Sequence, residues 1–240
     1  MIRKFLAITL LLNLTACAEL HEVAKQLPQT QTNIPNSTIG NADIAAGLRQ
    51  ALDLGIDKQV SKLTQTNGFY GNDMVKILLP KELQKVDDGL RKIGLGSLAD
   101  EGLKVLNRAA EDAVKEATPI FVDAVKGITF NDAKSILVGS DNAATQYLSS
   151  KTETSLYNKF NPVIKNSFSK VGADKIWSNL ISKYNSIPFT DDVNPDLTDY
   201  VTEEALKGVF TMIEVEEKEI RTQYSSRTTD LLKKVFALQD

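Results

Sequence analysis

The 240-residue sequence contains a single cysteine, Cys17, and a single histidine, His21, and both lie close to the N-terminus. A Ser-His-Asp triad, a Cys-His dyad or a His-based zinc site requires an imidazole or a thiolate. None of these can form in the rest of the chain, and an intramolecular disulfide is excluded as well. Any reaction catalysed by the later residues would have to use carboxylate, lysine, serine or arginine side chains.

A basic segment is also missing. The sequence carries 28 Lys and Arg against 31 Asp and Glu. Removal of the leader described below takes away Arg3 and Lys4, which leaves 26 basic and 31 acidic residues and a formal charge of −5. Because neutralisation of phosphates dominates nucleic-acid affinity, we expect no nucleic-acid partner.

Motifs for cofactors and metals are weak. Gly94-Leu95-Gly96 with Ala99 matches the dinucleotide fingerprint formally, but no strand–helix–strand context surrounds it, and a helix C-cap before a turn explains it better. Ser167–Lys170 matches S-x-x-K without the companion motifs of penicillin-binding enzymes. Asp192–Glu203 spaces its oxygen atoms as a calcium loop does, but places Leu197 where a glycine is needed. We therefore expect no cofactor and no metal.

The N-terminus has the features of a lipoprotein leader. Arg3 and Lys4 precede the apolar run Phe5–Leu14, which at about ten residues is too short for a bilayer span of about twenty. The segment Leu14-Thr15-Ala16-Cys17 resembles the bacterial lipobox, whose cysteine is acylated and becomes the mature N-terminus. We predict a signal peptide over residues 1–16, with an ordinary signal peptide and a chance cysteine as the alternative.

Lipidation of Cys17 would make the membrane a partner of the chain, because acyl chains on one residue supply the hydrophobic signals that stable anchoring requires. Ala18 follows the cysteine, and by resemblance to Gram-negative lipoproteins the lack of Asp there indicates the inner leaflet of the outer membrane, facing the periplasm. Residues 17–42 have two prolines and no sustained period. We interpret them as a flexible tether with a reach of roughly 25–30 Å, in which His21 is solvated.

The segment Leu98–Gly127 carries one apolar stripe at spacings of three and four, which predicts an α-helix or a pair of helices broken near Pro119. Other segments carry matching stripes, and a body of about 200 residues can bury roughly 70% of its unfolded surface in one core. We predict a single all-α domain over residues 43–240, with antiparallel helices packed around this central amphipathic helix and no substantial sheet. The further expected helices cover 43–63, 82–93, 129–137, 140–160 resuming at 163–171 after Pro162, 174–184, 195–224 and 227–238.

Caps and breaks support these boundaries. Thr129 with Asp132 forms a capping-box pattern, and Ser140 is the expected cap of the next helix. Gly68–Asn72 has turn chemistry. The apolar run Met74–Leu79, stopped by Pro80, has no partner strand and is expected to be extended or a short helix.

Four polar residues are candidates for a ligand-binding site. Asn107, Arg108 and Glu111 lie in the central helix, and Arg227 flanks the last turn between helices. A guanidinium held by carboxylates can present a preorganised fork to an anionic ligand. We expect Arg108 to be partly buried and held by Glu111 or by a carboxylate of another segment. The alternative is a solvated helix face with weak i,i+4 pairs.

Eight segments, spread over nearly the whole body, are Gly47–Leu52, Ile77–Pro80, Asn107–Glu111, Phe121–Ala124, Asp132–Leu137, Ala144-Thr145, Asp199–Val201 and Arg227–Leu232. Through these segments the body resembles a bacterial family named domain of unknown function 4197. That resemblance implies a helical envelope protein and supplies no reaction or catalytic residue.

Three functions remain open. The favoured one is a non-enzymatic, lipid-anchored periplasmic module that binds a partner or ligand. The second is an enzyme that uses Arg108 and Glu111 in a cleft. The third is a carrier of apolar small molecules, with Phe69, Tyr70, Phe121 and Trp177 around a cavity, although aromatic rings more often fill a core. A polar cleft at Arg108 would favour the enzyme, an apolar tunnel the carrier, and a filled core the partner-binding module.

Overall fold

The computed structural model of the chain describes residues 39–92, 94, 96–175, 178, 182 and 196–239. The leader, most of the tether, Trp177 and the first residues of the calcium-like pattern lie outside these residues. In the described part every regular element is helical, as predicted. The helices are α2 (Asn41–Leu63), α3 (Lys81–Lys92), α4 (Gly96–Val114), α5 (Ala117–Lys126), α6 (Phe130–Leu137), α7 (Ala143–Lys170), α9 (Thr198–Thr222) and α10 (Asp230–Phe236), with a short 3₁₀ turn η1 (Tyr224–Ser226) before the last.

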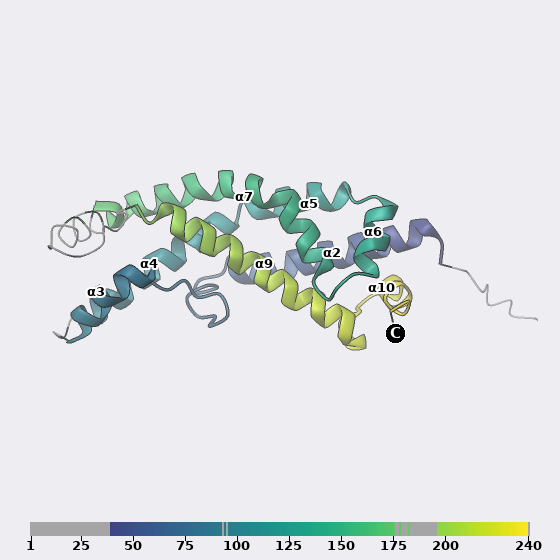
Figure 1. Cartoon of the computed structure of the whole chain (residues 1–240), viewed down its shortest axis with the longest axis horizontal. Helices are drawn as coiled ribbons and strands as arrows, with labels where there is room; N and C mark the ends of the chain where they lie inside the picture. The colour runs from purple at the N-terminus through teal and green to yellow at the C-terminus, as the bar shows by residue number, and fades with distance from the viewer. Residues whose placement is uncertain are drawn as a thin grey trace, which may run out of the picture. The chain divides into compact units, whose positions relative to one another are not determined.

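The two longest helices, α7 and α9, lie side by side and run in opposite directions (Figure 1). The predicted central helix, α4, packs against α2, α3, α5, α7 and α9, which confirms its place among the other helices. Shorter helices surround this group. α2 packs on α5, α6, α9 and α10, so it joins the C-terminal helices to the middle of the chain.

The central stripe is carried by two helices, α4 and α5. The break falls at residues 115–116, between Val114 and Ala117. It precedes Pro119, which is thereby placed in the first turn of α5. A proline is tolerated in a first turn because the N–H groups there have no intrahelical acceptor. The chain can thus redirect its apolar face without losing a backbone hydrogen bond at the proline.

The expected interruption at Pro162 is absent, and α7 is a single helix of 28 residues. Proline in a helix interior removes one hydrogen bond and clashes with the carbonyl four residues earlier. Here that carbonyl belongs to Asn158, and both Asn158 and Pro162 are exposed, so water can reach this part of the helix. Phe160 and Ile164, on the opposite face, are fully buried. Because the side chains before and after the proline are buried in the core, α7 continues through Pro162 although proline disfavours a helix interior.

The segment between α2 and α3 is a series of turns followed by an extended stretch over residues 76–80. Asn67 has a positive φ of 64°. Phe69, which follows shortly after, is fully buried. Its ring lies on Gly208 of α9, where a Cβ atom would come within 2.7 Å of the ring carbon Cε1. The glycine allows α9 to approach this irregular segment closely.

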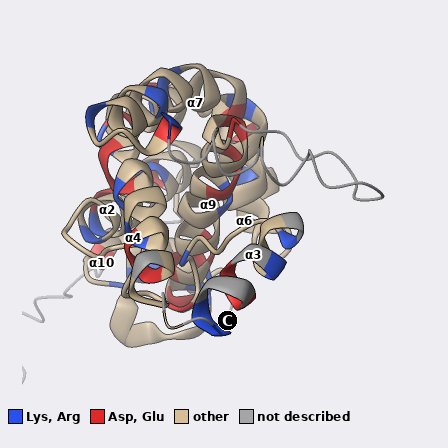
Figure 2. Cartoon of the chain, turned by 90° about the vertical axis from the view of Figure 1, so that its left-hand side faces the viewer, with Lys and Arg blue, Asp and Glu red and all other residues tan. Residues whose placement is uncertain are grey.

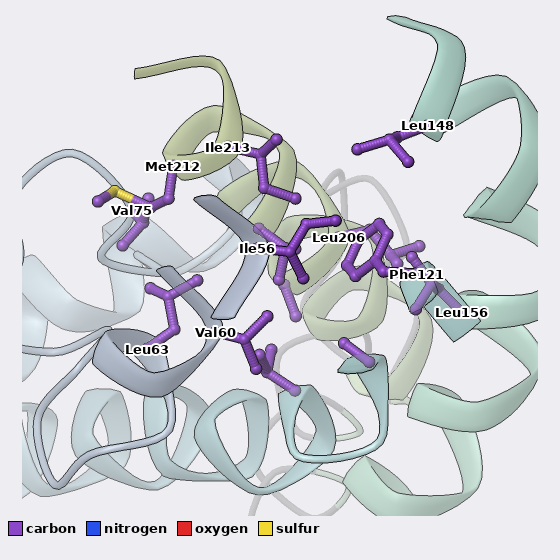
Figure 3. Packing of buried hydrophobic residues seen from close by; sticks show 14 of the residues in the cluster. Ile56, Val60, Leu63, Val75, Phe121, Leu148, Leu156, Leu206, Met212 and Ile213 are labelled. Carbon is purple, nitrogen blue, oxygen red and sulfur yellow. The ribbon is translucent and has the colours of Figure 1, made fainter. Parts of the chain in front are cut away.

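The core is filled by aliphatic and aromatic side chains from α2, α5, α7 and α9 (Figure 3). Phe121 is fully buried and meets Phe210 edge to face, with ring centroids 5.9 Å apart. Phe69 and Phe121, two of the four aromatic residues considered for a carrier cavity, are thus packed within the core.

Lys and Arg positions are interspersed with Asp and Glu positions along the helices in the view of Figure 2. The part of the chain that the structure describes has no helix with the length and apolar character needed to cross a membrane.

Candidate functional site

Asn107 is fully buried and joins α4 to the extended stretch before α3. Its Oδ1 accepts a hydrogen bond from the Ile77 N–H at 2.8 Å, and its Nδ2 donates to the Ile77 carbonyl, also at 2.8 Å. The same Nδ2 donates to the Leu103 carbonyl one turn earlier at 2.8 Å. The amide therefore pairs with both backbone groups of Ile77, as a neighbouring strand would. Its hydrogen-bonding capacity serves the chain's own backbone.

Glu111 lies one helical turn after Asn107 and is 5% exposed. Its Oε1 accepts a hydrogen bond from the Phe69 N–H at 3.2 Å. Buried backbone groups in irregular segments need such partners, because an unpaired one costs about as much as a lost hydrogen bond. Through these hydrogen bonds, Asn107 and Glu111 hold the segment between α2 and α3 against one face of α4.

Arg108 does not join them. It is exposed, and within the described part of the chain it makes no ion pair or hydrogen bond. The expectation of a partly buried arginine is therefore wrong, and neither Glu111 nor a carboxylate of another described segment holds it. Positions 107 and 111 share a helix face, whereas position 108 is turned by about 100° from position 107. Asp112, one helical turn after Arg108, is paired with Lys115 at 2.7 Å.

Arg227 is 2% exposed and lies at the C-terminal end of α9. Its Nε donates to the Ile220 carbonyl at 3.1 Å and its Nη2 to the Arg221 carbonyl at 3.0 Å. The last carbonyls of a helix lack intrahelical donors and carry partial negative charge, so a guanidinium stabilises them. The fourth candidate thus caps the C-terminal end of α9.

A buried polar network that sequence reasoning missed is centred on Glu217 and Arg221 of α9. The two side chains are 6% and 5% exposed, and Arg221 donates to Glu217 Oε1 from Nε at 2.9 Å and from Nη2 at 2.8 Å. Charges placed in the interior are costly unless they are paired and hydrogen-bonded. Both are satisfied here by further contacts with two other helices.

Glu217 caps the N-terminus of α7 from a different helix. It accepts hydrogen bonds from the N–H groups of Ala144 and Thr145, at 2.9 and 2.8 Å, and from the Thr145 hydroxyl at 2.8 Å. The N-cap residue itself is Asn142, whose side chain makes no cap hydrogen bond, and Ser140, the expected cap, lies outside the helix. A carboxylate at this position also complements the positive end of the α7 dipole.

Arg221 performs the opposite task at the end of α6. Its Nη2 donates to the Ile136 carbonyl at 2.9 Å and its Nη1 to the Leu137 carbonyl at 3.2 Å. The start of α6 is closed by the predicted capping box, in which Thr129 and Asp132 exchange hydrogen bonds. That hydrogen bonding lowers the pKa of Asp132. One ion pair of α9 therefore holds the corner at which α6 ends and α7 begins.

The neighbouring Glu216 faces α2. It accepts hydrogen bonds from the Lys58 ammonium at 2.9 Å and from Gln59 Nε2 at 2.7 Å, and the first of these raises the pKa of Lys58. A cavity of about 20 Å³ adjoins Glu216, Glu217 and Arg221, which is room for roughly one water molecule. The signal for this cluster in the sequence is that Glu216 and Glu217 fall between Ile213 and Ile220, at stripe positions where apolar residues are expected.

Two open grooves lie along α7. One, of about 460 Å³, is shared with α5, and the other, of about 500 Å³, is shared with α9. The α7–α9 groove combines hydroxyl groups and carboxylates with Leu206 and Phe210. At its edge the Tyr157 hydroxyl donates to Asp199 at 2.8 Å, which raises the pKa of Tyr157. Both volumes fall in the range of small-ligand sites.

The remaining motifs gain no support as sites. Gly94 has a φ of +81° and follows the last turn of α3, as a helix C-cap does. The Ser167 hydroxyl donates weakly to Asp112 at 3.4 Å. Among the described residues, no three His, Cys, Asp or Glu side chains are grouped so as to hold a metal ion.

In a comparison with protein families, residues 38–237 match the family described as a protein of unknown function, DUF4197. No curated protein and no solved structure matches the chain.

Replacing Asn107 by alanine should leave the buried N–H and C=O groups of Ile77 without their hydrogen-bond partners. We expect the free energy of unfolding to fall by about 2–4 kcal/mol, since each buried unsatisfied group costs about 1–3 kcal/mol. Urea titration followed by circular dichroism measures it. Arg108→Ala is the matched control from the next position and should change stability by less than about 0.5 kcal/mol. Equal losses of unfolding free energy in the two variants would contradict a stabilising role for the hydrogen bonds between Asn107 and Ile77.

Glu217→Gln keeps the size of the side chain but leaves the buried Arg221 charge without a counter-ion. We expect a loss of roughly 3–5 kcal/mol in the free energy of unfolding. Glu219→Gln, two residues away on the same helix, removes a carboxylate that is 40% exposed and 3.7 Å from Lys58, and should cost under about 1 kcal/mol. Thermal and urea unfolding compare the two. A Glu217→Gln protein as stable as the Glu219→Gln protein would disprove this role.

Proposed function

The chain belongs to the DUF4197 family, and we propose that it acts as a lipid-anchored, non-catalytic binding module of the bacterial cell envelope. One observation carries the proposal. Four buried polar side chains, those of Asn107, Glu111, Glu217 and Arg221, bind their own chain's backbone at helix ends or in the segment between α2 and α3. Side chains committed in this way are poorly available to a substrate, which leaves the surface for recognition.

The anchor rests on the sequence. Cys17 is the only thiol, it closes a lipobox-like segment, and a positive and an apolar segment precede it. We propose that acylated Cys17 holds the domain at the inner leaflet of the outer membrane, on a tether that faces the periplasm.

The two rival functions have less support. Arg108 is exposed and Glu111 is buried against Phe69, so these residues form no shared cleft for Arg/Glu chemistry. Phe69 and Phe121, offered as carrier residues, are packed in the core, and the cavity that the described core residues line beside Glu216 holds about 20 Å³. A pocket for a small-molecule ligand usually has a volume of about 300–1,000 Å³.

Recognition is best supported at the α7–α9 groove. Its walls carry Ser149, Thr154 and Glu153 from α7 and Glu203 and Lys207 from α9, and Phe210 supplies an apolar contact. Groups of this kind fix the orientation of a polar ligand or a partner's side chains. We propose that a polar partner binds here.

Cys17→Ser should release the protein from the membrane fraction or leave it as an uncleaved precursor, because the lipid can no longer be attached. Fractionation of cells and intact-mass measurement test this. Membrane fractionation and mass that stay the same as in the unsubstituted protein would contradict the anchor.

A photo-crosslinking residue at position 154 in the α7–α9 groove should give a discrete adduct in intact cells. The same residue at position 61, which is exposed on α2, is the control and should give no such adduct. Bands that are identical at the two positions, or none at either, would contradict the groove as the binding surface.

A further inference from the structure

Three of the most exposed large apolar side chains gather where α6, α9 and α10 end. Val138 is 75% exposed, Tyr224 is 63% exposed and Leu238 is 55% exposed. Val138 follows the last residue of α6, Tyr224 lies in the turn after α9, and Leu238 lies just beyond α10. We call these three residues the apolar tip.

Contacts between their neighbours bring the three together. The Gln239 side chain donates to the Leu137 carbonyl, so the residues next to Leu238 and Val138 touch. Arg221, near the end of α9, donates to the same carbonyl. The Lys233 ammonium of α10 lies 5.8 Å from the centre of the Tyr224 ring. The tip is therefore one local surface, although its members are up to 100 positions apart in sequence.

The tip lies at the end of the domain where the chain enters. α2 begins at Asn41, and its first half packs on α10 so closely that a Cβ atom on Gly47 would meet Val235 Cγ2 at 2.5 Å. α6 and α10 flank this part of α2 (Figure 1). Cys17 is 24 residues before Asn41, and a flexible linker of that length has a reach of roughly 25–30 Å.

We infer that the apolar tip inserts into the lipid surface to which the chain is anchored, an inference that rests on the proposed lipidation of Cys17. With Cys17 anchored, the domain stays close to the membrane, so the tip meets the lipid surface at a high effective concentration. Even a weak apolar contact can then form. Tyrosine is favoured at the boundary between lipid and water. The long stems of Lys134 and Lys234 can lie along the bilayer while their ammonium groups stay in water.

Charges of both signs lie near the tip in sequence, which sets the character of the contact. Lys134, Lys233 and Lys234 lie close in sequence to Val138 and Leu238, as do Asp141 and Asp230, and Lys233 pairs with Asp230 at 3.6 Å. Because charges of both signs are present, attraction to anionic headgroups contributes little. The contact is apolar and should be insensitive to salt.

The test uses the full lipidated chain, reconstituted into vesicles of zwitterionic phospholipid that carry a quencher in their acyl chains. Acylated Cys17 has no free thiol, so Val138→Cys and Leu238→Cys each introduce a single site for an environment-sensitive dye. Val171→Cys is the matched control, because Val171 is 58% exposed at the C-terminal end of α7, away from the tip. Circular dichroism verifies that all three variants keep the helical fold.

We expect the dyes at positions 138 and 238 to shift to the blue and lose intensity by lipid quenching, while the dye at position 171 does neither. The difference should persist at about 0.5 M salt, where exposed charges are strongly screened. Equal quenching at all three positions would overturn the inference. So would shielding of the dyes at 138 and 238 in detergent solution without vesicles, since that would indicate a protein contact. A chain that does not float with the vesicles would instead contradict the proposed anchor.

Discussion

The buried ion pair between Glu217 and Arg221 is the interaction on which the arrangement of the helices most depends. Glu217 accepts from the free N–H groups at the start of α7, and Arg221 donates to the last carbonyls of α6. The pair thus places each charge at the helix end whose dipole it complements. Because the two charges are interior, α6, α7 and α9 are held in one relation to each other, and any displacement would leave a buried charge or backbone group unpaired.

The same logic recurs through the domain. Asn107 and Glu111 serve the backbone of the segment between α2 and α3, and Arg227 serves the end of α9. An all-α domain with many short helices has many free N–H and C=O groups at helix ends. Buried polar side chains, most of them on the long helices, satisfy these groups in the interior, where water cannot. This use explains why three of the four residues considered as ligand contacts are found with backbone partners.

A functional consequence follows from that use. Polar groups that bind the backbone stabilise a single arrangement of helices, and the binding that we propose therefore uses surfaces, the α7–α9 groove and the apolar tip. The proposed lipid anchor fits this division of tasks. It would keep the domain near one membrane and let weak surface contacts act at high effective concentration.

The sequence by itself determined the all-α class, the central helix, the capping box at Thr129 and Asp132, and the glycine that ends α3, because these depend on apolar spacing and on residues at most four positions apart. Only the tertiary structure decided that α7 continues through Pro162, that Asn107 and Glu111 face inward while Arg108 faces water, and that Glu217 replaces a local cap for α7. Those outcomes rest on partners such as Ile77, 30 positions from Asn107, and Ala144, 73 positions from Glu217. A local sequence pattern cannot predict which distant backbone group a polar side chain will bind.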